Sequence, residues 1–182
     1  GWCGRYKMNV VLNLHKAIGN YCDIPEEVQL LDDAALQERV IALWLEIERR
    51  YHDFPGLAFE ILNEVRNVDP VKWNAFADRT IRAIRARNPE RWIVVGSTCW
   101  NHPATLKDLR VWDDPRVVYA FHMYMPHGFT HQRGVLQAGP LYENAEVPYP
   151  GRATVVRELK PAVEWAAAHP DKILWNGEFG TI

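Results

Sequence analysis

Two glutamates, Glu64 and Glu178, each lie at the end of an apolar, strand-like run, and more than a hundred residues separate them. A glutamate at the end of an apolar strand is costly to bury unless it is paired or hydrogen-bonded, so proteins seldom keep one there without a use. Two carboxyl groups in different surroundings can act as proton donor and nucleophile, which is the pair that hydrolysis of a glycosidic bond requires. We therefore predict that these two side chains meet in one active site.

Five near-continuous apolar runs have the length of β-strands and alternate with segments of helical period. The expected strands are residues 7–15, 57–63, 92–97, 117–124 and 173–178. Continuous apolar runs indicate strands that are covered on both faces, as in a parallel sheet built from βαβ units. The length and the ordinary globular composition favour one domain over residues 1–182. The predicted fold class is therefore α/β, with about five parallel βα units.

Three helices are expected between these strands. Residues 34–52 follow a possible cap at Asp32 or Asp33, and residues 70–88 follow the cap and first-turn pair Asp69-Pro70. The third segment, 154–169, contains Pro161, which either kinks the helix or begins a second one.

Polar and aromatic residues close or follow these strands. In a parallel α/β architecture the functional loops lie at the carboxyl ends of the strands, so we expect these residues to gather at one rim. They are His15, Asn63, Glu64, Trp100, Asn101, His122, Tyr124 and Glu178. The long segment 125–152, rich in glycine, proline and aromatic residues, has the character of a functional loop.

Charge and cysteine content exclude several classes of protein. The net charge of -2 gives no basic surface for nucleic acid or anionic lipid, and no apolar run is long enough to cross a bilayer. We therefore expect neither a nucleic acid nor a membrane partner. Cys3, Cys22 and Cys99 have no close spacing, so they predict neither a disulfide framework nor a metal site.

Four short motifs follow one another through successive βα units: LNE at 62–64, FHMY at 121–124, FTHQ at 129–132 and NGEFG at 176–180. In order and spacing they resemble glycoside hydrolase family 5, the cellulase family. The resemblance implies a partial TIM (β/α)8 barrel, with Glu64 as the acid/base on the fourth strand and Glu178 as the nucleophile on the seventh. It implies neither a cofactor nor a metal.

The same resemblance assigns the substrate-binding residues. They are His15, Asn63, Trp100, Asn101, His122 and Tyr124. Asn63 would bond the sugar 2-hydroxyl, His122 and Tyr124 would lie beside the nucleophile, and Trp100 would be a platform for a sugar ring. The implied activity is endo-acting, retaining hydrolysis of a β-1,4-linked glucan, with a polysaccharide or oligosaccharide as substrate. Because such polymers lie outside cells, we expect the parent protein to be secreted.

Two departures from the family pattern stand out. Val65 occupies the position after the acid/base glutamate where the family has proline. The chain also supplies strands three to seven only, whereas a complete barrel takes about 250 residues. The sheet is therefore expected to have two unpaired edges. We expect these to be covered by a second copy of the chain, by rearrangement, or by the rest of a longer protein.

Other interpretations stay open at this stage. The chain could be a carbohydrate-binding remnant with misplaced acids, or could act on β-mannan. A metal-dependent hydrolase would use a set of three histidines, His15, His122 and His131. Taken singly, Glu64 could form an ion pair with Arg66, and Glu178 could cap a neighbouring helix.

Overall fold

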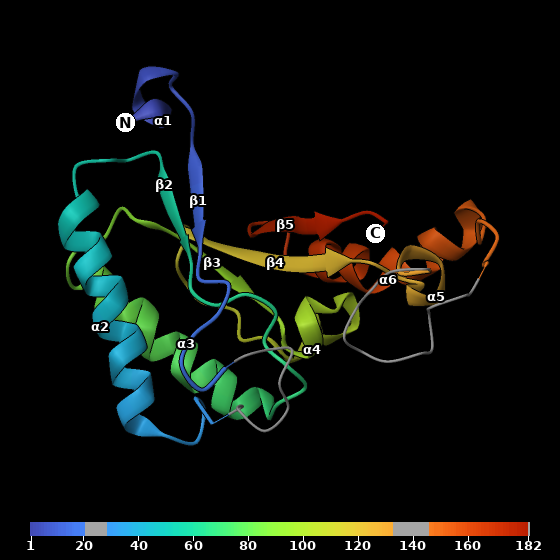
Figure 1. The fold of residues 1–182 in the computed structure, drawn as a ribbon, viewed down its shortest axis with the longest axis horizontal. Coiled ribbons are helices and arrows are strands. Elements are labelled where there is room, and N and C mark those ends of the chain that lie inside the picture. Colours follow the sequence, from blue (N-terminus) through green and yellow to red (C-terminus); the bar gives the residue numbers. More distant parts are fainter. Residues whose placement is uncertain (21–28, 133–145, 182) are drawn as a thin grey trace.

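The computed structural model describes residues 1–20, 29–132 and 146–181, which contain a five-stranded sheet whose strands are all parallel (Figure 1). The strands are β1 (Val10–Asn13), β2 (Leu57–Glu60), β3 (Trp92–Gly96), β4 (Val117–Met123) and β5 (Ile173–Phe179). They neighbour one another in chain order, β1-β2-β3-β4-β5. Cys22 and positions 133–145 of the predicted long loop lie outside the described residues.

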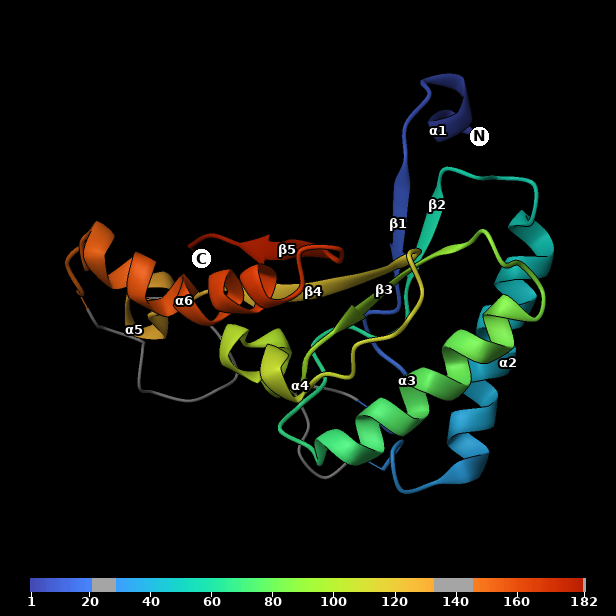
Figure 2. The ribbon, with the colours of Figure 1, turned by 180° about the vertical axis from the view of Figure 1, so that it is seen from behind.

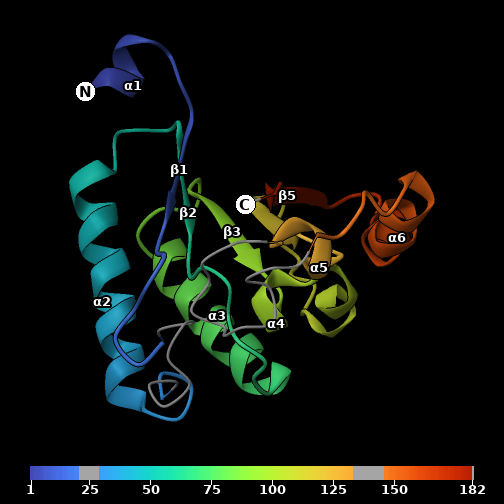
Figure 3. The same cartoon turned by 45° about the vertical axis from the view of Figure 1, so that its right-hand side comes forward.

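The described residues also form helices. They are α1 (Trp2–Arg5), α2 (Ala34–Tyr51), α3 (Pro70–Arg85), α4 (Thr98–Asn101), the 3₁₀-helix η2 (Pro103–Asp108), α5 (His127–Thr130) and α6 (Arg152–Ala168). The longer ones, α2, α3 and α6, cover the outer side of the sheet (Figures 1 and 2). Helices α2 and α3 lie side by side next to β1, β2 and β3, while α6 runs along β4 and β5 (Figures 1 and 2). In Figure 3 the strands turn progressively from β1 to β5, so the sheet curls into a half-barrel. The predicted α/β fold, a partial barrel of five parallel units, is confirmed.

The helix starts follow from capping residues. Asp33 accepts hydrogen bonds from the backbone N–H groups of Ala35 and Leu36, at 2.8 and 3.1 Å, which selects it over the alternative cap Asp32. Asp69 accepts from the N–H of Val71 at 2.8 Å, and proline follows it in the first turn. Such bonds satisfy N–H groups that have no partner inside the helix.

Two helix tryptophans fix the carboxyl ends of the central strands. Trp44 of α2 stacks on Phe59 and donates its indole N–H to the carbonyl of Ile61, just past β2, at 3.1 Å. Trp73 of α3 donates to the carbonyl of Gly96, the last residue of β3, at 3.0 Å. Both indoles are buried, and a buried N–H needs such a partner. The hydrophobic core thereby holds the rim from which the polar residues project.

The structure corrects two expectations. Burial on both faces holds for β2, β3 and β4 but is wrong for β1 and β5, where Val11 and Phe179 are 41% and 73% exposed. These are the edge strands, and each has a neighbour on one side only. The idea that Pro161 begins a second helix is also wrong, because α6 runs through it as one helix.

Within the described ranges, no helix combines the length and the apolar character needed to cross a bilayer.

Candidate active site

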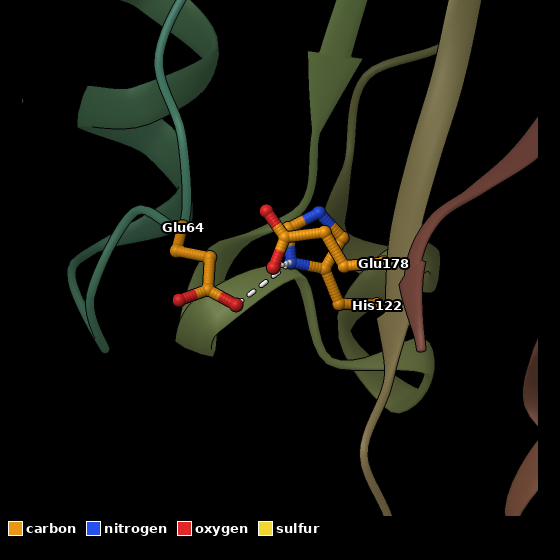
Figure 4. Close-up of side chains that lie close together, drawn as sticks. All are labelled: Glu64, His122 and Glu178. Atoms are coloured by element: carbon orange, nitrogen blue, oxygen red, sulfur yellow. Dashed lines mark hydrogen bonds and ion pairs between the residues drawn. The ribbon is translucent and has the colours of Figure 1, made fainter. Parts of the chain in front are cut away.

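A register shift between β4 and β5 sets the direction of Glu178. Phe121 pairs with Asn176, and the next pair is His122 with Glu178, so that Gly177 is passed over. Because side chains alternate between the faces of a strand, such a bulge redirects the residues that follow it. It brings the carboxyl group of Glu178 alongside the imidazole of His122 (Figure 4).

Glu64 lies in the turn that follows β2. The chain before it is held by hydrogen bonds from Ile61 N to the carbonyl of Val94, 3.2 Å, and from Asn63 N to the carbonyl of Leu14, 3.0 Å. Glu64 itself has a left-handed φ of 39°, which side chains with a Cβ seldom adopt. This backbone turn directs the Glu64 carboxyl group toward His122 (Figure 4).

The two glutamates meet at His122, as predicted from their strand-end positions. The Nδ1 atom of His122 is 2.7 Å from Oε1 of Glu64 and 3.5 Å from Oε2 of Glu178. One polar atom from each of the three side chains can be chosen so that all lie within 4.8 Å of one another. Glu64 contacts His122 rather than Arg66, whose guanidinium lies 5.5 Å from the ring centroid of Trp100.

Tyr124 supplies a second donor to Glu178. Its hydroxyl donates to Oε2 of Glu178 at 3.1 Å. Burial, with the negative charge of Glu178 and the bond to it, raises the pKa of Tyr124 to about 12. The phenol therefore stays protonated across the pH range in which enzymes work, and remains a hydrogen-bond donor to the carboxylate.

An open cavity of about 480 Å³ lies above this group. It is lined by His15, Glu64, Cys99, Trp100, His102, His122, Tyr124, Met125, His127, His131 and Glu178. Six of the eight predicted site residues are therefore in its wall. The other two, Asn63 and Asn101, are buried beneath the rim and do not line it.

Asn63 is held from below by Asn13, which in turn bonds Glu60, and the sequence singled out neither of these two residues. Asn13 at the end of β1 donates its side-chain amide to Oε2 of Glu60, 2.7 Å, and to Oδ1 of Asn63, 3.1 Å. With its oxygen engaged, Asn63 keeps a side-chain NH₂ group that has no partner among the described residues. Glu60 closes β2 and is only 4% exposed, and the same strand-end criterion that selected Glu64 could have found it.

Burial raises the pKa of the Glu60 carboxyl group. The negative charge of Glu178 raises it further, and the hydrogen bond from Asn13 lowers it. A carboxyl with a raised pKa contributes less stability as pH rises through its titration range, because ionisation is then more costly in the folded state.

Two further histidines of the cavity wall, His127 and His131, lie close together. Burial lowers the pKa of His127 and His131, whose rings are 4.8 Å apart, and the proximity of other histidines lowers it further. Within the described part of the chain, His15 and His131 belong to no cluster whose ligand atoms could share an ion. The alternative of a metal held by His15, His122 and His131 is therefore wrong.

The family model described as Cellulase (glycosyl hydrolase family 5) matches residues 1–182, the whole of the chain. The chain belongs to this family of cellulases. The resemblance to family 5 predicted a partial barrel, and the curved sheet agrees with that prediction (Figure 3). Both glutamates lie at the carboxyl rim of this sheet (Figure 4).

Curated relatives of this family 5 chain are named for enzymes. It is 43% identical to "Cellodextrinase A" of Ruminococcus flavefaciens, over 99% of the chain and 55% of that protein. It is 32% identical to "Endoglucanase C" of Acetivibrio thermocellus, over 100% of the chain and 61% of that protein. The family 5 chain thus spans a little over half the length of these relatives.

Solved structures agree with the fold. A hyperthermophilic endo-beta-1,4-glucanase in complex with substrate superposes with a TM-score of 0.82 at 26% identity, covering 97% of this family 5 chain and 55% of that protein. Endoglucanase Cel5A of Thermotoga maritima, solved in complex with mannotriose, gives 0.80 at 27% identity, covering 97% and 56%.

Proposed function

We propose that this chain is part of the single catalytic domain of an endo-acting retaining glycoside hydrolase that cleaves β-1,4-linked glucan. The separation of the two acids carries the proposal. Retaining enzymes place their carboxyl groups about 5 to 5.5 Å apart, whereas inverting enzymes leave about 6.5 to 9.5 Å for a water molecule. One carboxyl oxygen of Glu64 and one of Glu178 lie within 4.8 Å of each other, which favours retention.

The proposed reaction has two displacements. The Glu178 carboxylate attacks the anomeric carbon and forms a glycosyl ester, while the bond to the leaving oxygen breaks and Glu64 gives that oxygen its proton. Water then attacks the same carbon, Glu64 takes a proton from the water, and the ester bond to Glu178 breaks. His122 engages Oε1 of Glu64, so Oε2 of Glu64 is available to carry the transferred proton.

Replacement of Tyr124 with phenylalanine is expected to reduce kcat/KM about ten- to a hundredfold, because a hydrogen bond to a charged group contributes about 1.5–3 kcal/mol. Measurement of kcat/KM on a soluble β-glucan, for the variant and for wild type, tests this. A rate equal to that of wild type would contradict the role of the hydroxyl.

The open cavity and its aromatic wall support endo action, in which the enzyme binds the middle of a polysaccharide rather than its end. Trp100 is 39% exposed in the cavity wall and offers a flat face to a sugar ring, and Arg66 lies against it. The names of the relatives, endoglucanase and cellodextrinase, favour β-1,4-glucan. The mannotriose complex of a related structure makes β-1,4-mannan the second candidate, and kcat/KM on matched glucan and mannan oligosaccharides decides between them.

The stereochemistry of the product tests the mechanism. During hydrolysis of a β-1,4-glucan oligosaccharide followed by proton NMR, the β-anomer of the new reducing end should appear first and then mutarotate. Initial appearance of the α-anomer would overturn the retaining assignment. If the wild-type chain binds cellooligosaccharides but releases no reducing sugar, the alternative of a binding remnant is correct.

We propose that the unpaired edges of the sheet are covered in the assembled protein. Val11 and Leu12 on β1 and Phe179 on β5 are exposed, and an apolar sheet edge recruits further strands. We expect a second copy of the chain, or the remaining strands of a longer secreted protein, to cover these edges. Size-exclusion chromatography with light scattering should show self-association; a stable monodisperse monomer would contradict pairing with a second copy.

A further inference from the structure

The turn that follows β3 has an uncommon backbone. Cys99, Trp100 and Asn101 have successive φ values of 56°, 56° and 55°, so the short helix α4 is left-handed over these residues. Left-handed residues with a Cβ are strained, and such strain persists where the surroundings hold it in place. Asparagine is one of the residues that tolerate this conformation best.

The turn is bonded to the chain just after Glu64. The backbone N–H of Cys99 donates to the carbonyl of Arg66 at 3.1 Å, and that of Trp100 donates to the carbonyl of Val65 at 2.8 Å. The loop that carries Glu64 and the turn that carries Asn101 therefore form one hydrogen-bonded unit. A displacement of either would move the other.

Asn101 points from this turn toward the back of His122. It is fully buried, and its Nδ2 lies 3.2 Å from Nε2 of His122. The lack of a side chain at Gly96 makes this position available: a Cβ there would lie 2.3 Å from Oδ1 of Asn101. The lack of a side chain at Gly177 likewise leaves room for the imidazole, because a Cβ added there would lie 3.1 Å from Nε2 of His122.

Acidic groups face His122 from several elements. Glu64 comes from the turn after β2, Glu60 closes β2, and Glu178, which Tyr124 also contacts, comes from β5. Nδ1 faces two of these carboxyl groups and therefore carries a proton. Three nearby acids would also favour a second proton and a charged ring. The NH₂ group of Asn101 opposes this, because two N–H donors would then face each other at Nε2.

We propose that Asn101 is a positioning residue for the reaction: its side-chain NH₂ donates to Nε2 of His122 and keeps this imidazole neutral, with its single proton on Nδ1 directed at Glu64 and Glu178. The role differs from the direct substrate contact predicted from the sequence. It deepens the proposed function and rests on it.

The charge of the His122 ring matters because it affects the acidity of Glu64, the proposed general acid. An imidazolium next to Glu64 would stabilise its carboxylate and make it a stronger acid, so that Glu64 would lose its proton at a lower pH. A neutral Nδ1–H group orients the carboxyl without adding a positive charge. Asn101 would thereby set the upper pH limit of activity through His122, without touching the substrate.

The test is Asn101→Asp, which keeps the size of the side chain and its tolerance of the left-handed backbone, but whose carboxylate accepts a hydrogen bond from a protonated Nε2. The alkaline limb of kcat/KM should move to lower pH by about one unit or more. The matched control is Asn9→Asp, the same chemical change at an exposed residue before the amino end of β1, where the limb should not move. A loss of rate at all pH values with an unmoved limb would overturn the proposal.

Imidazole ¹⁵N chemical shifts give a second readout that needs no turnover. The wild-type protein should show the neutral His122 tautomer with its proton on Nδ1, and Asn101→Asp should show an imidazolium at neutral pH. A wild-type ring protonated on Nε2 would overturn the proposal, even if Asn101→Asp fails to fold. Absence of turnover on every glycan with the expected tautomer would instead count against the proposed function and leave the role of Asn101 in positioning the ring intact.

Discussion

Replacing Glu178 with glutamine is expected to abolish hydrolysis of soluble β-1,4-glucan, with a fall in kcat on the order of 10⁶, as for removal of other enzymatic nucleophiles. Glutamine keeps the shape of the side chain and can still accept the hydrogen bond from Tyr124. It cannot form the glycosyl ester, so the first displacement has no nucleophile. Release of reducing sugar by the purified variant, compared with wild type, measures the effect.

Two further variants sharpen this experiment. Glu64→Gln removes a general acid and should lower kcat/KM on the polymer about 10²- to 10⁴-fold. Most of this loss should be recovered on an aryl glycoside, because its leaving group needs no proton. Glu164→Gln alters an exposed carboxyl on α6 that pairs with Lys160 and should leave the rate unchanged. If Glu178→Gln hydrolyses the polymer at the wild-type rate, Glu178 is not the nucleophile.

Replacing Arg91 with methionine should lower the free energy of unfolding by about 3–5 kcal/mol, the usual cost of leaving a buried charge without its partner. The side chains of Arg91 and Glu48 are each 1% exposed, and Nε of Arg91 lies 2.6 Å from Oε2 of Glu48. Arg91 also donates to the carbonyls of Tyr51, Phe54 and Leu57, at 2.9, 2.8 and 2.6 Å. The pair thus joins the end of α2 to the starts of β2 and β3.

Urea unfolding at several pH values measures this contribution. Burial alone would raise the pKa of Glu48, but the hydrogen bonds from Arg91 and Asn88 outweigh burial and lower it. A lowered carboxyl pKa contributes stability above its unfolded value, near 4.5, and the contribution is lost as pH falls through the folded value. The methionine variant should therefore lose less stability on acidification than wild type.

The exposed Arg49→Met is the matched control for this change. Arg49 bonds Glu46 on the surface of α2, and exposed ion pairs contribute little to stability. Its unfolding curve should overlie that of wild type. Equal destabilisation by both substitutions would mean that the arginine stems, rather than the buried charge, account for the loss.

One rule connected the sequence to the candidate site: polar residues at the carboxyl ends of apolar strands gather at one rim. It brought Glu64, Glu178, His122 and Tyr124 together, because a parallel sheet places such ends side by side. The apolar runs also predicted all five strands, with ends that differ by a few residues. The longest difference is at β1, where the expected strand 7–15 is reduced to Val10–Asn13.

Other features depend on contacts that no local pattern encodes. The shift that passes over Gly177 arises from pairing between two strands far apart in the sequence. The left-handed backbone at Cys99 and Trp100 is held by two carbonyls of another loop. Asn101 is an ordinary strand-end polar residue in the sequence, and only its burial behind His122 separates it from the residues that line the cavity. Periodicity cannot report such long-range geometry.

The order β1-β2-β3-β4-β5 has a consequence for folding. Every strand pairs only with the units just before and just after it in the sequence, as in a repeat protein, so stability accumulates through nearest-neighbour interfaces. Loop closure then spans one βα unit at a time, which keeps contact order low for a sheet protein. The sheet can therefore grow strand by strand as the chain leaves the ribosome, and each added unit offers the template on which the next one pairs.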